Sequence, residues 1–514
     1  MRRTQIIIPF VFAWMGCVQS APIAVDLDAG QRVDAGASLD AAIADASPGA
    51  DAGPGADAAS PPDSGPSADA GQPGIDAGPS NDAGITGWAR TIDDQVQAVA
   101  SAVVADAQGN VYVTGKVQGD TNFGGGVRRT TGSFYLASYG PDGSYRWDAL
   151  LGLFTQYVER NLVLTVDSLG RPVVAGSYTE AGKEDLFVAT YDPATGMRVS
   201  LRQFGGSLDD ELNAITADAS GGVFVTGSVR GNVDFLGTSH TVVSNSDAFV
   251  AHLATVAGAS DWFRIYPTTA SEARGQAIAF HGGLVHFAGG FGGTLTVGSS
   301  ALNGDFGDAF LGKVGADGSA ASAIAIASGG GGGLLELSGM VVGADGTRFL
   351  HGRFRGGLTL SATSLSSSRS YDVFLCAVAA NDTISWAHSY GQSNAGGLGG
   401  IDWGQSIALD ARGDLLIAGA MNGGLDLGTQ MLPTAIGDGE DVMFLASISA
   451  QGDTRWAIRG GSDYDDDIAN SVFAQADGSV LVAGTISGPG GIGGVVLPFS
   501  GGGLRSGFVA RFRP

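Results

Sequence analysis

The sequence predicts an all-β repeat fold for residues 87–514, and three observations lead to this prediction. A run of β-branched and aromatic residues that ends in glycine recurs seven times after Gly87. Each copy has a short apolar segment before this run and a phenylalanine-led segment after it. The recurring glycines lie 51 to 67 residues apart, which leaves room for four short strands and their turns. Seven such units predict a seven-bladed β-propeller with four antiparallel strands in each blade.

The glycine-terminated run is expected to be the second strand of each blade. Its first copy is Val111-Tyr112-Val113-Thr114-Gly115, and these residue types favour strands. The glycines that end the seven copies are Gly115, Gly176, Gly227, Gly289, Gly352, Gly419 and Gly484.

A strand of small and β-branched residues precedes each run and is expected to line the centre of the ring. Gln405-Ser406-Ile407-Ala408 is one example. The two strands are joined by turns such as Asp106-Ala107-Gln108-Gly109. There the aspartate accepts backbone hydrogen bonds and the glycine takes a positive φ. Blades four, five and seven replace the aspartate with Phe280, Gly343 and Gln475.

The third and fourth strands are identified by aromatic residues. The third strands are expected to begin near Phe134, Phe187, Phe249, Phe310, Phe374, Phe444 and Phe508. The fourth strands carry a tryptophan twelve or thirteen residues later, at Trp147, Trp262, Trp386 and Trp456. Blades two and four lack this tryptophan.

Blade seven is expected to be completed by a strand from the N-terminal side of the propeller. No fourth-strand segment follows the third strand at Phe508–Phe512. Gly87-Trp88-Ala89-Arg90 precedes the first inner strand and matches the segments around Trp147 and Trp456. Pairing this segment with Phe508–Phe512 would close the ring and leave no exposed sheet edge.

The repeat resembles that of a known family. Asp106-Ala107-Gln108-Gly109-Asn110 with the following strand to Gly115, then Phe123-Gly124-Gly125, Phe134 and Trp147, is similar to the bacterial seven-bladed β-propeller (SBBP) repeat. The Asp-x-x-Gly-Asn turn is also similar to NHL repeats. The resemblance covers residues 87–514, and with the N-terminal segment it is typical of myxobacterial surface lipoproteins. It implies a fold and a location but no activity.

Two further segments precede the propeller. Residues 1–20 are predicted to be a signal peptide, because a basic start leads into an apolar stretch too short to span a bilayer. Trp14-Met15-Gly16-Cys17 resembles a lipobox, so Cys17 is the candidate lipidation site; the alternative is ordinary cleavage near Ser20. Residues 21–86 contain no aromatic residue and no lysine, which predicts a disordered acidic stalk. We expect an outer-membrane or cell-surface lipoprotein, or alternatively a secreted protein.

The composition argues against some binding partners and against disulfide bonds. Acidic residues outnumber basic ones 51 to 27, giving a formal charge of −24. This balance argues against nucleic acid and against docking on anionic lipid, so membrane contact is expected only through the lipid anchor. If Cys17 is acylated, Cys376 has no cysteine to pair with, so no disulfide is expected. We expect Cys376 to be a buried apolar side chain and the protein to be a monomer.

One polar position recurs in every inner strand. Its members are Ser101, Asn161, Asn213, Gln276, Ser338, Gln405 and Asn470, here called the ring residues. Carboxylates precede most of them, at Glu159, Glu211, Glu272, Glu336, Asp402 and Asp467, with Asp93 and Asp94 before the first. The ring residues are candidates for a ligand-binding channel mouth. The alternative is that they only cap backbone groups where strands begin.

No catalytic constellation is recognised. The six histidines (His240, His252, His281, His286, His351 and His388) do not show zinc-ligand spacing, and no nucleophile elbow or phosphate loop is present. No cofactor is predicted, except that Asp463, Asp465, Asp466 and Asp467 are candidate ligands for Ca²⁺.

The favoured function is a non-enzymatic, surface-tethered binding or scaffold module for an envelope or extracellular protein or polymer. A carbohydrate-binding propeller is the alternative, with Trp403 as the candidate stacking residue because it is off the repeat pattern. A secreted hydrolase or lyase is a third hypothesis. A cluster of side chains that breaks the sevenfold pattern at one mouth would favour it.

Overall fold

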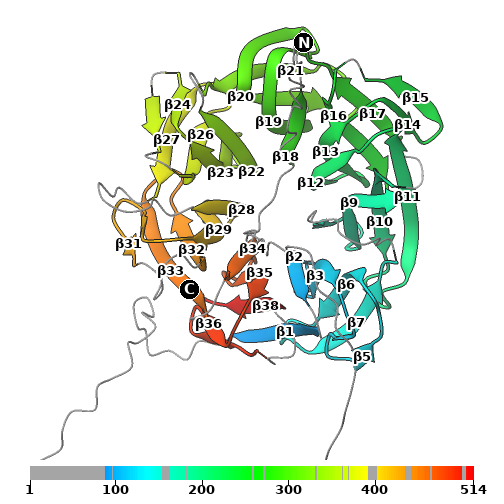
Figure 1. The fold of residues 1–514 in the computed structure, drawn as a ribbon, viewed down its shortest axis with the longest axis vertical. Helices are drawn as coiled ribbons and strands as arrows, with labels where there is room; N and C mark the ends of the chain where they lie inside the picture. The colour runs from blue at the N-terminus through cyan, green and yellow to red at the C-terminus, as the bar shows by residue number, and fades with distance from the viewer. Residues whose placement is uncertain are drawn as a thin grey trace, which may run out of the picture. The chain divides into compact units, whose positions relative to one another are not determined.

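The computed structural model describes residues 87–94, 97–152, 162–180, 182–242, 244–256, 260–269, 272–329, 333–361, 363–367, 370–391, 402–433, 441–462, 466–499 and 505–514. These residues form strands and no helix, and the strands are arranged as seven blades in a ring (Figure 1). The predicted all-β, seven-bladed propeller is therefore confirmed. Within this part of the chain, no helical segment meets the length and hydropathy needed to cross a membrane.

The first four blades run in chain order, each from its inner to its outer strand. Blade one contains β2 (Ala98–Ala105), β3 (Val111–Val117), β6 (Ser133–Tyr139) and β7 (Tyr145–Leu150). Blade two contains β8 (Val163–Val166), β9 (Pro172–Glu180), β10 (Lys183–Tyr191) and β11 (Arg198–Gly206). Blade three contains β12 (Glu211–Asp218), β13 (Gly222–Val229), β16 (Asp247–Ala254) and β17 (Trp262–Tyr266). Blade four contains β18 (Ala273–His281), β19 (Leu284–Val297), β20 (Ser300–Gly315) and β21 (Ser322–Ala327).

The remaining blades repeat the pattern until the last strand. Blade five contains β22 (Leu334–Val342), β23 (Arg348–Arg355), β26 (Asp372–Val378) and β27 (Ile384–Tyr390). Blade six contains β28 (Trp403–Leu409), β29 (Leu415–Met421), β32 (Val442–Ile448) and β33 (Thr454–Ser462). Blade seven contains β34 (Ile468–Ala474), β35 (Val480–Ile486), β38 (Ser506–Phe512) and β1 (Trp88–Asp94).

The order of strands in blade seven confirms the predicted closure. Strand β1 pairs antiparallel with β38 in a register that sets Trp88 opposite Arg511 and Ile92 opposite Gly507. The register is that of a normal fourth strand, because Trp456 likewise lies opposite the residue three places after its third-strand phenylalanine. In Figure 1, β1 lies beside β38, and the chain then continues into β2 of blade one.

The recurring glycine of the second strand is required by a bulge in the inner strand. In the six blades whose ring residue is described, the ladder between first and second strands shifts register at that residue. The bulge presses the inner-strand backbone against the glycine: a Cβ on Gly419 would lie 1.8 Å from the carbonyl oxygen of Trp403. Only a residue without a side chain fits this approach.

Small hairpins extend most blades in a way that the sequence did not predict. Between the second and third strands, where a plain loop was expected, the structure has β4 (Thr121–Asn122) with β5 (Val127–Arg128), β14 (Asn232–Phe235) with β15 (Thr238–Thr241), β24 (Gly357–Leu360) with β25 (Thr363–Ser366), β30 (Leu425–Asp426) with β31 (Met431–Leu432), and β36 (Gly490–Ile492) with β37 (Val495–Leu497). Three of them pair with the outer strand of the preceding blade. Blade two joins its second and third strands by a tight connection instead, which explains the short 51-residue spacing.

The tryptophans of the outer strands hold neighbouring blades together. The Trp147 indole packs in a tilted arrangement against Tyr112 of its own blade, with 5.9 Å between ring centroids. Its Nε1 donates to the carbonyl oxygen of Pro193 in blade two at 3.0 Å. Trp262 and Trp386 make the equivalent bonds to Ala316 and Ala450, both at 2.9 Å. Each core cluster is therefore shared by two blades.

Candidate functional site

The ring residues lie on the inner strands, each at the bulge described above. Ser101, Asn213, Gln276, Ser338, Gln405 and Asn470 all occupy it, whereas Asn161 lies outside the described residues. A bulge turns a side chain out of the ordinary alternation of the strand. The repeated polar residue is thus part of the local backbone geometry in each blade.

Four of these side chains connect one blade to the next. Asn213 Nδ2 donates to the Gly275 carbonyl at 2.9 Å, and Asn470 Nδ2 donates to the Ala100 carbonyl at 3.0 Å. Ser338 donates to Gly404, and Gln276 accepts from the backbone of Leu337. In every case the partner directly precedes the ring residue of the following blade, so these bonds run around the central channel. Each of these four side chains thus uses a donor or an acceptor within the fold, which explains a repeated polar residue without any ligand.

The carboxylates that precede the ring residues are mostly buried. Asp402 and Asp467 stand three residues before their ring residues, as does Asp210, and their exposed fractions are 1%, 0% and 0%. Asp467 accepts from the hydroxyl of Ser462 at 2.7 Å and from the backbone of Ser487 at 2.8 Å. Glu336 and Glu272 instead form ion pairs with nearby arginines. These groups anchor the loops at the mouth.

Burial changes the protonation of these aspartates. Desolvation is the main cause that raises the pKa of Asp402 to about 8, with the negative charge of Asp372 adding to it. Desolvation likewise raises the pKa of Asp210 to about 7 and that of Asp467 to about 6. The Oδ1 atom of Asp402 is buried and has no hydrogen-bond partner. The surroundings of Asp402 therefore favour its protonated form.

Replacing Asp402 with asparagine should change how stability depends on pH. A raised folded-state pKa means that the folded protein holds a proton the unfolded chain loses above about pH 4, so stability falls as pH rises from about 4 to about 8. Asp402→Asn should remove this pH-dependent loss of stability. At pH 8 the free energy of unfolding of the variant should exceed that of wild type by about 2 kcal/mol or more, whereas at pH 4 the two should be equal. Urea unfolding at both pH values measures the difference. An exposed control, Asp142→Asn, should stay parallel to wild type; if Asp402→Asn does the same, the assignment is wrong.

The candidate calcium ligands are only partly described. Asp463 and Asp465 lie outside the described residues, as do Glu159 and Cys17. Asp466 forms an ion pair with Arg505, and Asp467 is bonded within its loop as above. Among the described residues, no three His, Cys, Asp or Glu side chains converge as a metal site would require.

A cluster that breaks the sevenfold pattern, the feature expected of a hydrolase or lyase, lies at the mouth edge of blades five and six. Its one carboxylate, Glu336, is paired with Arg353. The guanidinium carbon of Arg353 lies 4.5 Å from the ring centroid of Tyr371 and 4.7 Å from that of Trp403. Arg355 covers Tyr371 as well, at 5.5 Å. Arg353 Nε donates to Glu336 at 2.6 Å. We call Glu336, Arg353, Arg355, Tyr371 and Trp403 the arginine–aromatic cluster.

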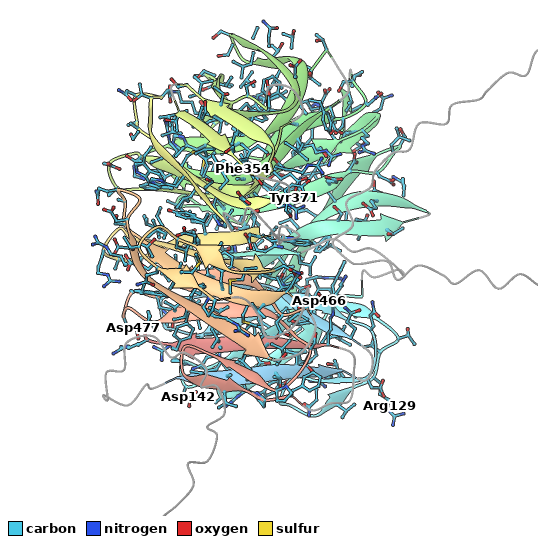
Figure 2. The ribbon with its side chains drawn as sticks, turned by 60° about the vertical axis from the view of Figure 1, so that its left-hand side comes forward. Arg129, Asp142, Phe354, Tyr371, Asp466 and Asp477 are labelled. Atoms are coloured by element: carbon cyan, nitrogen blue, oxygen red, sulfur yellow. The ribbon has the colours of Figure 1, made fainter. Side chains whose placement is uncertain are left out.

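The cluster is assembled from strand ends that face the same edge. Arg353 and Arg355 end β23, Tyr371 directly precedes β26, and Trp403 begins β28. In Figure 2, Tyr371 and Asp466 lie to the right of Asp142 and Asp477. Arg355 is exposed, and the other four side chains are partly exposed.

The chemistry of the cluster combines cations with aromatic faces. Arginine held on an aromatic ring is pre-ordered, which lowers the entropic cost of binding a carboxylate. Arg355 forms no ion pair with any residue that the structure describes. Trp403 was the candidate stacking residue for a carbohydrate, and Arg353 lies over its ring. The aromatic ring therefore supports a cation at this edge.

Sequence reasoning found Trp403 and Glu336 but missed the arginines and Tyr371. At the position of Arg353, one residue after the recurring glycine, the other blades have Lys116, Ser177, Ser228, Gly290, Ala420 and Thr485. A comparison of the repeats position by position would have shown this arginine as unusual.

Comparisons with known proteins add only distant likenesses. No family model matches the chain, and no curated protein matches its sequence. Among solved structures, it is similar to a periplasmic gluconolactonase of Pseudomonas aeruginosa (11% identity, 70% of this chain and 85% of that one, TM-score 0.37). It is also similar to a quinohemoprotein alcohol dehydrogenase of Comamonas testosteroni (9% identity, 84% and 76%, TM-score 0.42). A polysaccharide lyase, an ulvan lyase, matches at 11% identity over 77% and 93% with a TM-score of 0.42. Likenesses of this size transfer no activity.

Proposed function

We propose that the propeller is a binding module for an acidic extracellular polymer, such as a uronate-containing polysaccharide. The observation that carries the proposal is the arginine–aromatic cluster, in which Tyr371 supports Arg353 and Arg355 at one edge of the ring. Charge-assisted hydrogen bonds from arginine to carboxylate are among the stronger polar contacts in water. A polymer can repeat such contacts along its length.

Three features support binding over a purely structural role for the cluster. Its residues interrupt a repeat that is otherwise followed closely, it lies at a blade edge, and Arg355 is exposed. Its positive charge also stands out in a chain with a formal charge of −24. Long-range repulsion from the rest of the protein would then favour binding at this one edge over non-specific adsorption of a polyanion.

Binding of the full-length protein to immobilised polygalacturonate tests the proposal. We expect Arg355→Ala combined with Tyr371→Ala to weaken binding roughly tenfold or more, since one charge-assisted contact and its aromatic support are lost. Binding should also weaken at high salt, because the exposed charge is screened. The matched control is Arg412→Ala, an exposed arginine beyond the opposite end of β28.

Two outcomes would contradict this function. Equal loss of binding in the Arg412→Ala control would indicate non-specific attraction. Equal binding to a neutral glucan would show that carboxylates are not what the site recognises.

We also propose that the module is tethered to the cell surface through Cys17 and the acidic segment at residues 21–86. The support is the lipobox-like Gly16-Cys17 after a short apolar stretch. Labelling of growing cells with a fatty acid should mark the wild-type protein, and Cys17→Ala should release it into the medium. If the variant stays with the membrane fraction, the tether is not this lipid.

A further inference from the structure

Blade four lacks the tryptophan that seals the contact between neighbouring blades. In blades three, five and six, the pairs His252–Trp262, Ala377–Trp386 and Ser447–Trp456 occupy one repeat position of the third and fourth strands. The corresponding pair in blade four is Lys313–Ser322. A hydroxymethyl group thus stands where blades three, five and six have an indole.

The aromatic partner of the missing tryptophan is replaced as well. Three residues before the recurring glycine, blades one, three and five have Tyr112, Phe224 and Phe349. Each packs with its ring tilted against its own tryptophan. Blade four has His286 at this position. Its side chain is 5% exposed, and its Nδ1 atom is buried without a hydrogen-bond partner.

Blade five contributes an unusual cation to the same contact. Arg348 stands four residues before Gly352, where the other blades have the apolar residues Val111, Pro172, Val223, Val285, Leu415 and Val480. It is 2% exposed. Its Nη2 donates to Asp382 at 3.0 Å and to the Ala379 carbonyl, but its Nε is buried without a partner. A buried guanidinium donor without a protein acceptor is costly to the fold.

These replacements leave a cavity of about 220 Å³ between the two blades. Its lining includes His286, Lys313, Ser322, Ile324, Arg348 and Asp382. Lys313 Nζ lies 2.8 Å from Asp382, so two cations share one carboxylate. Burial, with Arg348 as the next cause, lowers the pKa of His286 to about 4, and the neutral histidine does not add charge. The cavity therefore carries a net positive charge and an apolar wall.

We propose that this cavity binds a small organic carboxylate. Arg348 and Ser322 both line this space and are the candidate hydrogen-bond donors, and Lys313 supplies the second positive charge. Ile324 and Leu311 form a wall for the hydrocarbon part of the ligand. The volume is below that of pockets for drug-sized molecules, so the ligand is small. The opposing interpretation is that the Arg348–Asp382–Lys313 ion pairs merely replace the indole as a link between blades.

Calorimetric titration of the full-length protein with benzoate, and with the smaller propionate, distinguishes a carboxylate site from a purely structural link between blades. We expect at least one of these carboxylates to bind and the neutral isostere benzamide to bind roughly tenfold more weakly or not at all. Ser322→Trp restores the repeat residue and fills the cavity, so it should abolish binding while the protein remains folded. Arg348→Met should abolish binding without filling the space, and Arg412→Met is the control that should change nothing.

Several results would overturn the inference. These are no binding of either carboxylate, equal binding to wild type and Ser322→Trp, or equal binding of benzamide and benzoate. If Ser322→Trp does not fold, Arg348→Met decides in its place. Polygalacturonate binding should be unchanged in both variants, so failure of this inference and failure of the proposed function can be told apart.

Discussion

Removing residues 87–92 should destabilise the propeller more than any single substitution, although it deletes only six residues. These residues form most of β1, the outer strand of blade seven, and Ile92 is fully buried. Trp88 Nε1 also donates to the Pro141 carbonyl at 2.9 Å, and Arg90 Nε donates to Gly143 at 2.8 Å, so the strand ties blade seven to blade one.

The expected loss can be estimated from what the strand buries. Burial of the Trp88 and Ile92 side chains contributes about 1.5–3 kcal/mol each. With the hydrogen bonds lost at the exposed edge of β38, the free energy of unfolding should fall by about 5 kcal/mol or more. Thermal unfolding should compare a chain that starts at Gly87 with one that starts at Asp93. Equal melting temperatures would mean that β1 does not close the ring.

Gly419→Ala is expected to have one of the largest effects among single substitutions at the recurring glycines. A Cβ at this position would lie 1.8 Å from the carbonyl oxygen of Trp403 and 2.9 Å from the ring of Phe444. The obstacle is backbone held at a bulge, which cannot rotate away as a side chain can. Overpacking of this kind costs about 1–3 kcal/mol and occasionally more, and we expect the upper end.

The matched control for this prediction is Gly357→Ala. Gly357 also lies in a strand, but no atom lies within 4 Å of the position its Cβ would take. Urea unfolding of both variants gives the two free energies. Similar values for Gly357→Ala and Gly419→Ala would show that the close approach does not explain the recurring glycine.

Much of this architecture was predictable because the same residue pattern recurs in each repeat. Seven glycine-terminated runs specify the number of blades, and the unpaired Trp88 segment predicts closure. The physical role of the glycine was not predictable, since the bulge opposite it has no residue pattern beyond one polar side chain. The two- to four-residue hairpin strands were missed because segments so short carry no measurable periodicity.

The candidate sites depend on departures from the repeat. Trp403 was recognised because a tryptophan is conspicuous, but Arg353 and Tyr371 belong to different strands and meet only in the folded blade. The ring residues were identified by position, yet their bonds to the next blade require the three-dimensional spacing of inner strands. Arg348 and Ser322 are visible in the sequence only after the seven copies are superimposed.

The seven blades share one structural pattern, and we propose that ligands bind where this pattern is broken, foremost at the arginine–aromatic cluster. Hydrogen–deuterium exchange of the full-length protein with and without polygalacturonate tests this proposal. We predict added protection in the backbone around Arg353–Arg355, Tyr371 and Trp403, with the turns at Asp142 and Asp477 unchanged. Protection spread evenly over all seven blades, or confined to the edge that carries those turns, would contradict the claim.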